Sequence, residues 1–343
     1  MRSNVDVFQV LTDEERDRIT ECEQPRWTSP MLATLTDERF DDPDWIYERK
    51  LDGIRILVFL EDGNPRLMTR NRKERNDTWP ELVDALRSMN PPNAIVDGEI
   101  VVFDGNVTSF SRLQNRSRVK DEDEARGRAE SVPAYLYLFD VLHLSGHDVG
   151  DVPLRSRKKL LKRAFDFDDP IRFLPHRNAD GVAFWREACD RGWEGVIAKD
   201  ATSAYVHDRS TSWLKFKCVD RQEFVVGGFT EPEGERVGFG AMLLGYHEDG
   251  DLVYAGRVGT GWDDDELGDL RDRMDGLERD TSPFDRDGPD DEEGVHWISP
   301  RLVAEIGFTE WTHEGRLRHP RYLGLREDKD PDEVVRERPR DTD

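Results

Sequence analysis

The amino-acid sequence predicts an α+β protein of two domains, the second of them built from β-strands. The first observation is length, because 343 residues correspond to two domains at roughly 100–200 residues per domain. The second is that strand-like apolar runs alternate with helical patterns up to about residue 218. The third is that the remaining chain consists mainly of short strands separated by glycine-rich turns.

The elements of the first domain follow from local patterns. Residues 1–29 are predicted to form an acidic lead-in, helical over Asp13–Glu23, before Pro25 and Pro30 break the pattern. β-rich and apolar runs bounded by turn residues predict strands at 45–48, 54–60, 94–103, 134–142, 196–198 and 213–218. Amphipathic runs predict helices at 82–89, 154–165 and 183–191.

The second domain shows strand patterns at 223–229, 240–247, 252–259, 296–308 and near Tyr322. Five short strands in about 115 residues indicate a small barrel of the OB type. An acidic helix is expected over 264–277, inside this domain. The predicted organisation is therefore a lead-in at 1–29, a first domain at 30–218, an OB-fold domain at 219–335 and a tail at 336–343.

Charge is spread along the whole chain, with 74 acidic against 50 basic residues and a formal net charge of −24. Only ten of the basic residues are lysines. This composition favours adaptation to high salt, where the Debye length falls to about 3 Å at 1 M and net charge no longer argues against nucleic-acid partners. The alternative is an acidic protein that avoids nucleic acids.

Three cysteines, Cys22, Cys189 and Cys218, form no CxxC pair, so neither a disulfide framework nor a structural zinc site is expected. The N-terminus lacks the basic and apolar segments of a secretory signal. No apolar run approaches the roughly 18 residues that a membrane span requires. These observations predict a cytoplasmic protein without a membrane partner.

The segment Lys50–Arg55, with the sequence KLDGIR, lies where one β-run passes into another. A lysine acts as a nucleophile only when deprotonated, which requires burial or neighbouring cations. Gly53 would let a nucleotide approach the backbone, and Arg55 offers a planar set of donors. Taken alone, the pattern fits an ordinary hairpin turn at Asp52–Gly53 equally well.

Further charged segments occur on buried strands downstream, where charges are costly unless they meet a metal, a phosphate or one another. Lys215 and Lys217 alternate on one strand and therefore point to the same face. The other segments are Asp97–Glu99, Phe139–Asp140, Glu194–Lys199 and Leu325–Lys329. Each alone fits an ion pair, but as a set they indicate a site for a nucleotide phosphate with Mg²⁺.

In this order and spacing the segments resemble the six motifs of the covalent nucleotidyltransferases, which comprise ATP-dependent DNA ligases, RNA ligases and capping enzymes. The chain is most similar to the ATP-dependent ligase domain of bacterial end-joining ligases. The distinguishing segments are Pro30–Leu35, Ser109–Arg116 and Leu317–Arg326. The resemblance implies an adenylyltransferase (ATP-grasp-like nucleotidyltransferase) domain of antiparallel sheets with helices, followed by an OB-fold domain. The composition suggests a haloarchaeal source.

The resemblance also implies roles for residues at matching positions. Lys50 corresponds to the nucleophile that is adenylated. Nucleotide-binding roles fall on Glu48 and Phe139 at the adenine, on Arg55, Arg70 and Glu99 at the ribose and phosphate, and on Lys215 and Lys217 at the α-phosphate. Glu194 and Glu99 correspond to metal-binding acids. Arg326 and Lys329 correspond to residues that orient pyrophosphate, positioned by Asp328, so the barrel is expected to close over the nucleotide.

The implied function is ATP-dependent sealing of 5′-phosphate/3′-hydroxyl nicks in DNA repair or end joining, with ATP and Mg²⁺ or Mn²⁺ as cofactors. The expected partners are nicked duplex DNA and repair proteins that bind DNA ends or act as sliding clamps, and the expected state is a monomer. The alternatives are an RNA ligase, a capping-type enzyme, or a non-catalytic OB-fold nucleic-acid binder.

Two features depart from the family pattern. Where the family often has a basic residue in a Pro-Gly turn, this chain reads Tyr205–Ser210, with an acid at Asp208. Only about 30 residues precede the core, so we expect no DNA-encircling domain, and no polymerase or nuclease module.

Overall fold

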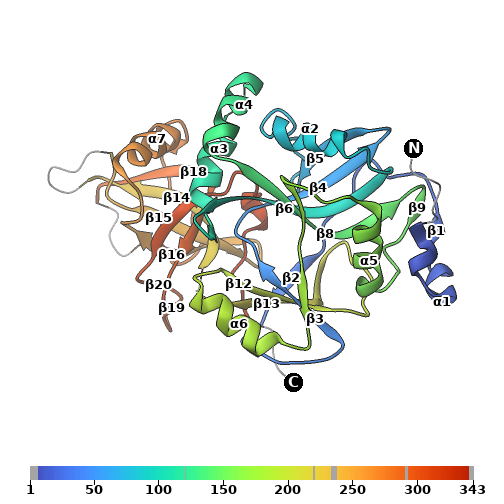
Figure 1. The fold of residues 1–343 in the computed structure, drawn as a ribbon. Helices are drawn as coiled ribbons and strands as arrows, with labels where there is room; N and C mark the ends of the chain where they lie inside the picture. The colour runs from blue at the N-terminus through green and yellow to red at the C-terminus, as the bar shows by residue number, and fades with distance from the viewer. Residues whose placement is uncertain (1–6, 120, 219–220, 233–237, 290–292, 340–343) are drawn as a thin grey trace. The chain divides into compact units, whose positions relative to one another are not determined.

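The structure is a computed structural model that describes residues 7–119, 121–218, 221–232, 238–289 and 293–339. The chain divides into two compact units, which Figure 1 colours from blue to yellow-green and from yellow to red. The first comprises the described part of Met1–Cys218 with Pro339, and the second the described part of Val219–Arg338. The first six residues of the predicted lead-in, residues 219–220 at the predicted boundary and the last four of the predicted tail lie outside the described residues.

The larger sheet of the first unit has the strand order β1-β9-β8-β6-β4-β5, with β7 paired to β6 and β10 paired to β8. Its strands are β1 (Thr20–Glu21), β4 (Ile54–Glu61), β5 (Asn64–Thr69), β6 (Ala94–Asp104), β7 (Val107–Thr108), β8 (Ala134–Leu144), β9 (His147–Asp148) and β10 (Ile171–Phe173). Only the β10–β8 pairing in this sheet is parallel. The central strands β4, β6 and β8 are buried along most of their length, as expected of strands covered on both faces.

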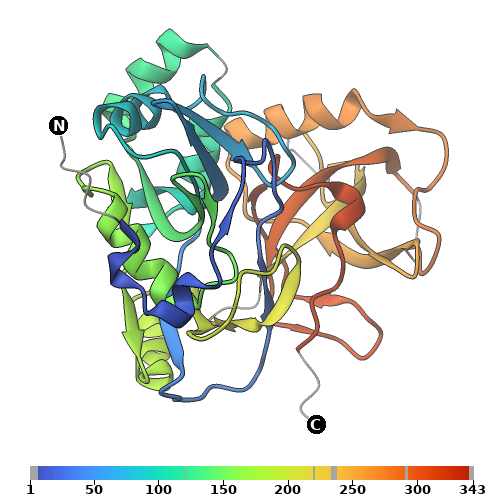
Figure 2. The same cartoon turned by 90° about the vertical axis from the view of Figure 1, so that its right-hand side faces the viewer.

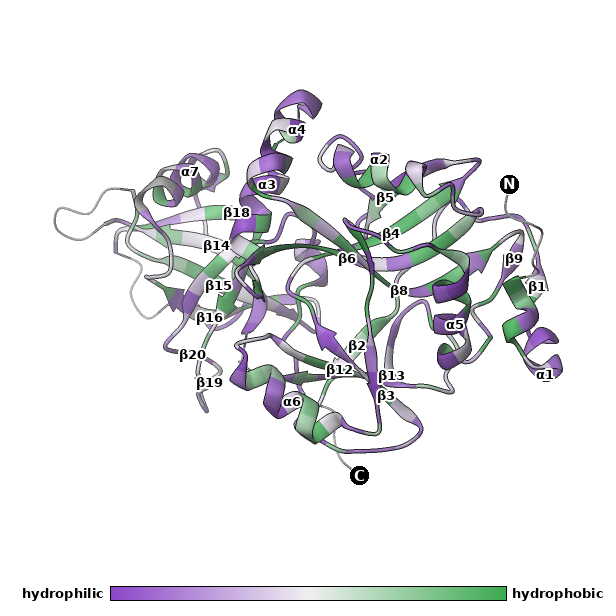
Figure 3. Ribbon diagram, viewed as in Figure 1, coloured by the Kyte–Doolittle hydropathy of each residue, from purple (hydrophilic) through white to green (hydrophobic). Residues whose placement is uncertain are grey.

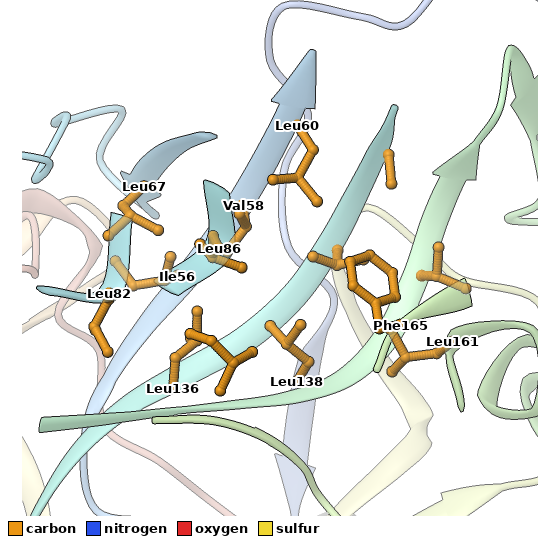
Figure 4. Packing of buried hydrophobic residues seen from close by; sticks show 14 of the residues in the cluster. Ile56, Val58, Leu60, Leu67, Leu82, Leu86, Leu136, Leu138, Leu161 and Phe165 are labelled. Carbon is orange, nitrogen blue, oxygen red and sulfur yellow. The ribbon is translucent and has the colours of Figure 1, made fainter. Parts of the chain in front are cut away.

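Helices α2 (Pro80–Ser88) and α5 (Leu154–Ala164) contribute to the hydrophobic core on one face of this sheet. Helix α2 begins with a proline, which fits the first helical turn because no intrahelical donor is lost there. Figure 4 shows Leu82 and Leu86 of α2 and Leu161 of α5 packed with Val58 of β4 and Leu138 of β8. Helices α3 (Phe110–Ser117) and α4 (Glu122–Ser131) follow β7, and α4 is mostly hydrophilic in Figure 3.

The smaller sheet has the order β11-β3-β12-β13-β2. Its strands are β2 (Leu32–Leu35), β3 (Trp45–Lys50), β11 (His176–Asn178), β12 (Gly195–Asp200) and β13 (Arg209–Lys217). Helix α6 (Gly181–Asp190) covers one face through Phe184 and Ala188. Trp213 of β13 joins a separate core cluster with Phe139 and Val101 of the larger sheet. The two sheets therefore face each other, and the predicted site residues of the first unit lie on strands of both or directly beside them.

The second unit is a β-structure around its own core, as the strand pattern predicted. Its main sheet has the order β16-β15-β14-β18-β17, with β21 also paired to β18. The strands are β14 (Arg221–Thr230), β15 (Met242–Glu248), β16 (Asp251–Val258), β17 (Glu278–Arg279), β18 (Val295–Gly307) and β21 (Arg321–Leu325), with a separate hairpin of β19 (Glu310–Trp311) and β20 (Leu317–Arg318). The predicted acidic helix is α7 (Asp264–Asp275).

The N-terminal segment corrects one prediction. Only α1 (Asp13–Arg16) is α-helical there, after the short 3₁₀ turn η1 (Val7–Val10), whereas a helix was expected over Asp13–Glu23. A capping box of Thr12 and Glu15 starts α1, but the helix buries no side chain, so little sustains it further. Figure 2 shows this blue segment beside the yellow-green α5, where Ser156 donates a 2.5 Å hydrogen bond to Glu15.

A second 3₁₀ turn, η2 (Pro331–Glu333), lies near the end of the second unit. Residues 336–338 of the predicted tail contact that unit, since the Glu337 N–H donates to Gln222 at 2.8 Å. Across the part of the chain that the structure describes, no helix has the length and apolar character needed to span a membrane.

Candidate active site

The smaller sheet aligns four of the predicted site residues in two rows. On β12, Gly195 lies opposite Lys50 of β3 on one side and Lys217 of β13 on the other. Ile197, two residues along, lies between Glu48 and Lys215 in the same way. Paired residues share a face, and neighbouring strands lie about 4.8 Å apart. The four side chains therefore project from one face within about 10 Å of one another across the strands.

Lys50 and Glu194 meet directly, because the Lys50 ammonium donates a hydrogen bond to Oε1 of Glu194. Glu194 immediately precedes β12 and its side chain is only 5% exposed, while that of Lys50 is 19% exposed. Gly195 follows with φ +145°, and a Cβ there would lie 2.1 Å from the Phe216 carbonyl oxygen. The glycine therefore permits the close strand pairing that brings Glu194 to Lys50.

Glu48 lies in a buried cluster with two lysines. Lys158 of α5 donates to its Oε1, and Lys199 of β12 lies 2.6 Å from its Oε2. All three side chains are at most 3% exposed. Burial acts to raise the pKa of Glu48, but the two ammonium charges outweigh it and hold the pKa below its usual value. Burial lowers the pKa of Lys199, and the charge of Glu48 offsets only part of that effect.

Lys158 is a residue that the sequence analysis did not single out. It lies in a run of basic residues on a predicted helix, which is typical of a solvated face. The signal that could have found it is its place in the helical pattern, because it is buried while the adjacent Lys159 is exposed. In a chain with only ten lysines, one at an inward position indicates a specific charged partner.

Arg55 is held by Asp97 in a bidentate ion pair with both N–O distances at 2.5 Å. Asp97 is fully buried and also accepts a hydrogen bond from the Tyr205 hydroxyl at 2.6 Å. Burial would lower the pKa of Arg55, but the charge of Asp97 raises it far above the usual value. Asp97 thus fixes the orientation of Arg55, which is predicted to bind the nucleotide. The sequence around Asp97 did not predict this role.

The predicted adenine-stacking residue, Phe139, is surrounded by cations in this structure. Its ring centroid lies 4.6 Å from Arg55 Cζ and 4.3 Å from Lys199 Nζ, which are cation–π distances. Trp213 lies edge-on at 6.3 Å. The ring is therefore part of a rigid aromatic and cationic wall, and adenine stacking on it stays a prediction.

Glu99 and Arg70 belong to the larger sheet. Glu99 pairs with Arg55 of β4 on one side and with Tyr137 of β8 on the other, so it shares the face that carries Arg55. Arg70 is half-buried in the turn directly after β5. The two acids predicted to bind metal, Glu99 and Glu194, thus come from the two facing sheets. Among the described residues no cluster of three or more potential metal ligands occurs.

Arg326, Asp328 and Lys329 form a charged cluster in the second unit. Arg326 donates to both oxygens of Asp328 at 2.9 Å and to Glu305 at 2.6 Å. Lys329 lies 2.9 Å from Glu223. Burial alone would lower the pKa of Arg326, but these carboxylates raise it well above its usual value. The predicted site residues of the second unit thus contact one another and carboxylates of the same unit. Those of the first unit likewise contact residues of the first unit.

Two expectations from the sequence need revision. A Cβ on Gly53 would lie 2.2 Å from the Ile100 carbonyl oxygen, so the pairing with β6 itself requires the glycine. Cys189 and Cys218 form a disulfide between α6 and the residue after β13, although no disulfide framework was expected. The topology, and not the cysteine spacing, brings these two thiols together. Cys22 is free and exposed.

The acidic turn that departs from the family pattern is tied to the chain's own backbone. The Asp208 carbonyl accepts from the Leu32 N–H at 3.0 Å, and Arg209 donates to the Ala33 carbonyl at 2.7 Å. Its strand β13 pairs in parallel with β2, where Arg209 lies opposite Leu32. In this arrangement Arg209 supports the sheet edge.

Comparison with known families covers both units. Residues 30–217 match the family model described as "ATP dependent DNA ligase domain", and residues 235–329 match "ATP dependent DNA ligase C terminal region". The chain is 39% identical over 323 residues to the multifunctional non-homologous end joining protein LigD of Pseudomonas aeruginosa, covering 92% of this chain and 37% of that protein. It is 34% identical over 306 residues to a DNA ligase of Haloarcula marismortui, covering 84% of this chain and 53% of that protein.

Among solved structures, the chain resembles mycobacterial DNA ligase D complexed with ATP and MES. The TM-score is 0.64 and the identity 36%, and the match covers 90% of this chain and 98% of that one. The chain thus spans between about a third and about half of the length of these two curated relatives. It matches nearly the whole of the solved chain.

Proposed function

This chain belongs to the ATP-dependent DNA ligase family, and we propose that it seals nicks between 5′-phosphate and 3′-hydroxyl ends through an adenylate on Lys50. The predicted fold is confirmed as a nucleotidyltransferase domain followed by an OB-fold domain. The observation that carries the proposal is the row Lys50, Gly195 and Lys217, with Glu194 bonded to the Lys50 ammonium. In this proposal Lys50 is the nucleophile, Glu194 accepts its proton, and Lys217 of the neighbouring strand is a phosphate-binding cation.

The first chemical step transfers AMP from ATP to the protein. The Lys50 nitrogen, after losing a proton, attacks the α-phosphorus, a nitrogen–phosphorus bond forms, and the bond to the β-phosphate oxygen breaks with release of pyrophosphate. Glu194 Oε1 accepts the hydrogen bond of this ammonium and can receive its proton. Lys215 and Lys217 project from the same face and would stabilise the charge that develops on the α-phosphate oxygens.

The second and third steps use the stored AMP. The 5′-phosphate of the nick attacks the lysyl-AMP phosphorus, which releases Lys50 and forms adenylated DNA. The 3′-hydroxyl then attacks the 5′-phosphorus, a phosphodiester bond forms, and AMP leaves. In this scheme Arg55 would hold the nucleotide phosphate or ribose, because Asp97 and Tyr205 fix its guanidinium in one orientation.

The donor set fits a magnesium or manganese ion. Mg²⁺ is usually held by one or two carboxylates and completes its shell with water and substrate phosphates. Glu194 and Glu99 supply two carboxylates from the facing sheets, and we propose them as its ligands. When bound, the ion would neutralise phosphate charge as a Lewis acid.

The cellular role that we propose is DNA repair by end joining. Support comes from the relatives whose names describe multifunctional non-homologous end joining proteins, although this chain spans only 37% of the Pseudomonas protein. Nicked duplex DNA would be the substrate, and proteins that bind DNA ends or act as sliding clamps the partners. We further propose that the chain acts as a cytoplasmic monomer.

The function is tested by incubating the protein with α-³²P-labelled ATP or GTP and then with matched nicked DNA and nicked RNA duplexes. A ligase of this family forms a covalent protein–AMP adduct with ATP and seals nicked DNA. An adduct with GTP would indicate capping-type chemistry, and preferential sealing of RNA would indicate an RNA ligase. A lack of any adduct with either nucleotide would leave only a nucleic-acid binder.

Arg326 and Lys329 should separate the steps of the reaction. Pyrophosphate leaves only during self-adenylation, so Lys329→Met should lower the adenylation rate by about 10²-fold, the usual effect of losing one electrostatic donor. Sealing of a pre-adenylated nick should change only a few-fold. Arg326→Lys is the second variant, because it keeps a charge beside Asp328 and Glu305.

The measurement is single-turnover kinetics of both steps, with circular dichroism to verify folding. Arg318→Gln is the matched control in the same unit, because its ion pair with Glu310 is more than half exposed. Equal losses in adenylation and in sealing of pre-adenylated DNA would contradict the assignment.

Salt should increase nick sealing, because we propose that the chain is adapted to high salt. Ordinary DNA-binding proteins lose about 10³–10⁵ in affinity between 50 and 200 mM salt. Here the net charge is −24, so at low salt the acidic side chains repel DNA and also repel one another. Molar salt screens both repulsions. The rate should therefore rise from about 0.1 M to about 3 M KCl with ATP and Mg²⁺ saturating. A steady fall with an intact fold would reject the adaptation.

A further inference from the structure

A separate cavity of about 810 Å³ lies in the first unit. None of the residues that line it has been given a role above in binding the nucleotide, the metal ion or a phosphate. The lining comprises Arg49, Phe103, Gly105, Asn106, Pro133, Tyr135, Tyr137, Arg172, Arg191 and Trp193. Three arginines and four aromatic rings are present, and none of these described lining residues is acidic. Such a surface suits an anion joined to a flat apolar group.

Arg49 is the residue that points to a ligand. Its Nε and Nη2 atoms are buried, and neither has a hydrogen-bond acceptor in the described part of the chain. Its guanidinium carbon lies 4.2 Å from the Trp193 ring centroid and 5.8 Å from that of Phe103. Burial lowers the pKa of Arg49, the charge of Arg191 lowers it further, and Tyr137 acts in the opposite direction. Two buried guanidinium nitrogens without an acceptor are costly, so an anion beside them would satisfy both.

The other two arginines are already held by carboxylates. Arg172 binds Asp169 at 2.5 and 2.8 Å, donates to the Tyr137 hydroxyl at 2.9 Å, and stacks 3.9 Å from the Tyr135 centroid. Arg191 is exposed and lies 2.7 Å from Glu187. These contacts orient both guanidinium groups beside the cavity while leaving other donors on each.

The position of the cavity relates it to the reaction. Arg49 directly precedes Lys50 on β3, and Trp193 directly precedes Glu194. Two residues that line the cavity are therefore sequence neighbours of the Lys50–Glu194 ion pair. The Arg49 guanidinium carbon also lies 5.8 Å from the ring centroid of Phe103, which belongs to the larger sheet. Consecutive Cα atoms are about 3.8 Å apart, so a phosphate at Arg49 would lie close to the phosphate that reacts at Lys50.

We propose that this cavity binds one nucleotide of the DNA strand close to the break, with its phosphate at Arg49 and Arg191 and its base against Trp193 and Tyr135. The volume lies within the range of about 300–1,000 Å³ that small-ligand pockets occupy. The assignment rests on the proposed ligase function, because it names where the substrate strand would lie. A free nucleotide has the same chemistry, and the experiment distinguishes the two sources.

The test measures binding of fluorescent nicked DNA to the full chain by anisotropy at several salt concentrations, beside self-adenylation with labelled ATP. Arg49→Gln and Arg191→Gln should each reduce the slope of log K against log salt by about 1, because each removes one phosphate contact. Trp193→Ala should weaken binding about tenfold, and Trp193→Phe should keep most of the affinity. Arg163→Gln on α5 removes an exposed charge and is the matched control.

The outcomes separate the possibilities. The proposal would be overturned if Arg191→Gln and Arg49→Gln both kept the wild-type affinity and salt slope. Arg191 is exposed, so its variant should fold normally. An altered ATP dependence of the adduct with unchanged DNA binding would also overturn it and assign the cavity to a free nucleotide. Failure of the wild-type chain to form an adduct would count against the proposed function alone, because DNA binding is measured independently.

Discussion

Replacing Lys50 by arginine or by alanine should abolish the covalent protein–AMP adduct, with a loss of at least about 10³-fold in ATP-dependent sealing. Arginine keeps the positive charge and can still pair with Glu194, but its guanidinium does not deprotonate in proteins. Alanine offers no nucleophile. The adduct is measured by gel autoradiography after incubation with α-³²P-ATP, and its site by peptide mass spectrometry.

The matched control is Lys159→Arg, an exposed lysine on α5 that should leave the adduct unchanged. Because Lys50→Arg preserves charge and approximate size, a folded variant without an adduct identifies the nucleophile. A label of normal yield in Lys50→Arg, or one mapped to another lysine such as Lys199, would refute the assignment.

Removing Asp140 should strongly destabilise the first unit. Asp140 and Arg157 are both fully buried, and two hydrogen bonds of 2.8 and 2.9 Å join them. The same guanidinium donates to the Val152 carbonyl at 2.6 Å and the Ser203 carbonyl at 3.0 Å, so it connects β8, α5 and two loops. Asp140→Ala would leave this charge buried without a counterion, which costs about 3–5 kcal/mol.

At about 2–4 °C per kcal/mol for a unit of this size, the melting temperature should fall by roughly 6–20 °C. The measurement is thermal unfolding by circular dichroism. The double variant Asp140→Leu/Arg157→Met should recover much of the loss, because an apolar pair of similar volume needs no counterion. Glu122→Ala in the exposed pair with Arg126 is the control and should change the melting temperature little. Equal stability of Asp140→Ala and wild type would show that the pair contributes nothing.

Asp140 also illustrates how a motif can combine different roles. Its position in the sequence, directly after Phe139, predicts that the two residues belong to one functional segment. In the structure Phe139 faces the cationic wall formed by Arg55 and Lys199, whereas Asp140 is joined to Arg157. Because a β-bulge interrupts the pairing of β8 with β6 near this point, strict alternation does not describe the segment.

The sequence by itself determined the α+β class, the β-rich second unit and the family, because these depend on local patterns and on the order of short motifs. The alternation of Lys215 and Lys217, and the strand character of the segments around Lys50 and Glu194, follow from a period of two. Those patterns placed Lys215 and Lys217 on one strand, as the structure has them, whereas Glu194 lies just before its strand. The roles of the individual residues stay predictions until the variants are measured.

Only the tertiary structure decided which charges meet. The partners of Glu48, Arg55 and Asp140 are Lys158, Asp97 and Arg157, and they come from 110, 42 and 17 residues away along the chain. No local periodicity encodes such pairs, since they arise when sheets and helices pack and every buried charge must find a counterion. The Cys189–Cys218 disulfide and the unsatisfied Arg49 beside Trp193 have the same origin. Sequence patterns specify which face a side chain takes, whereas packing specifies which side chains share that face.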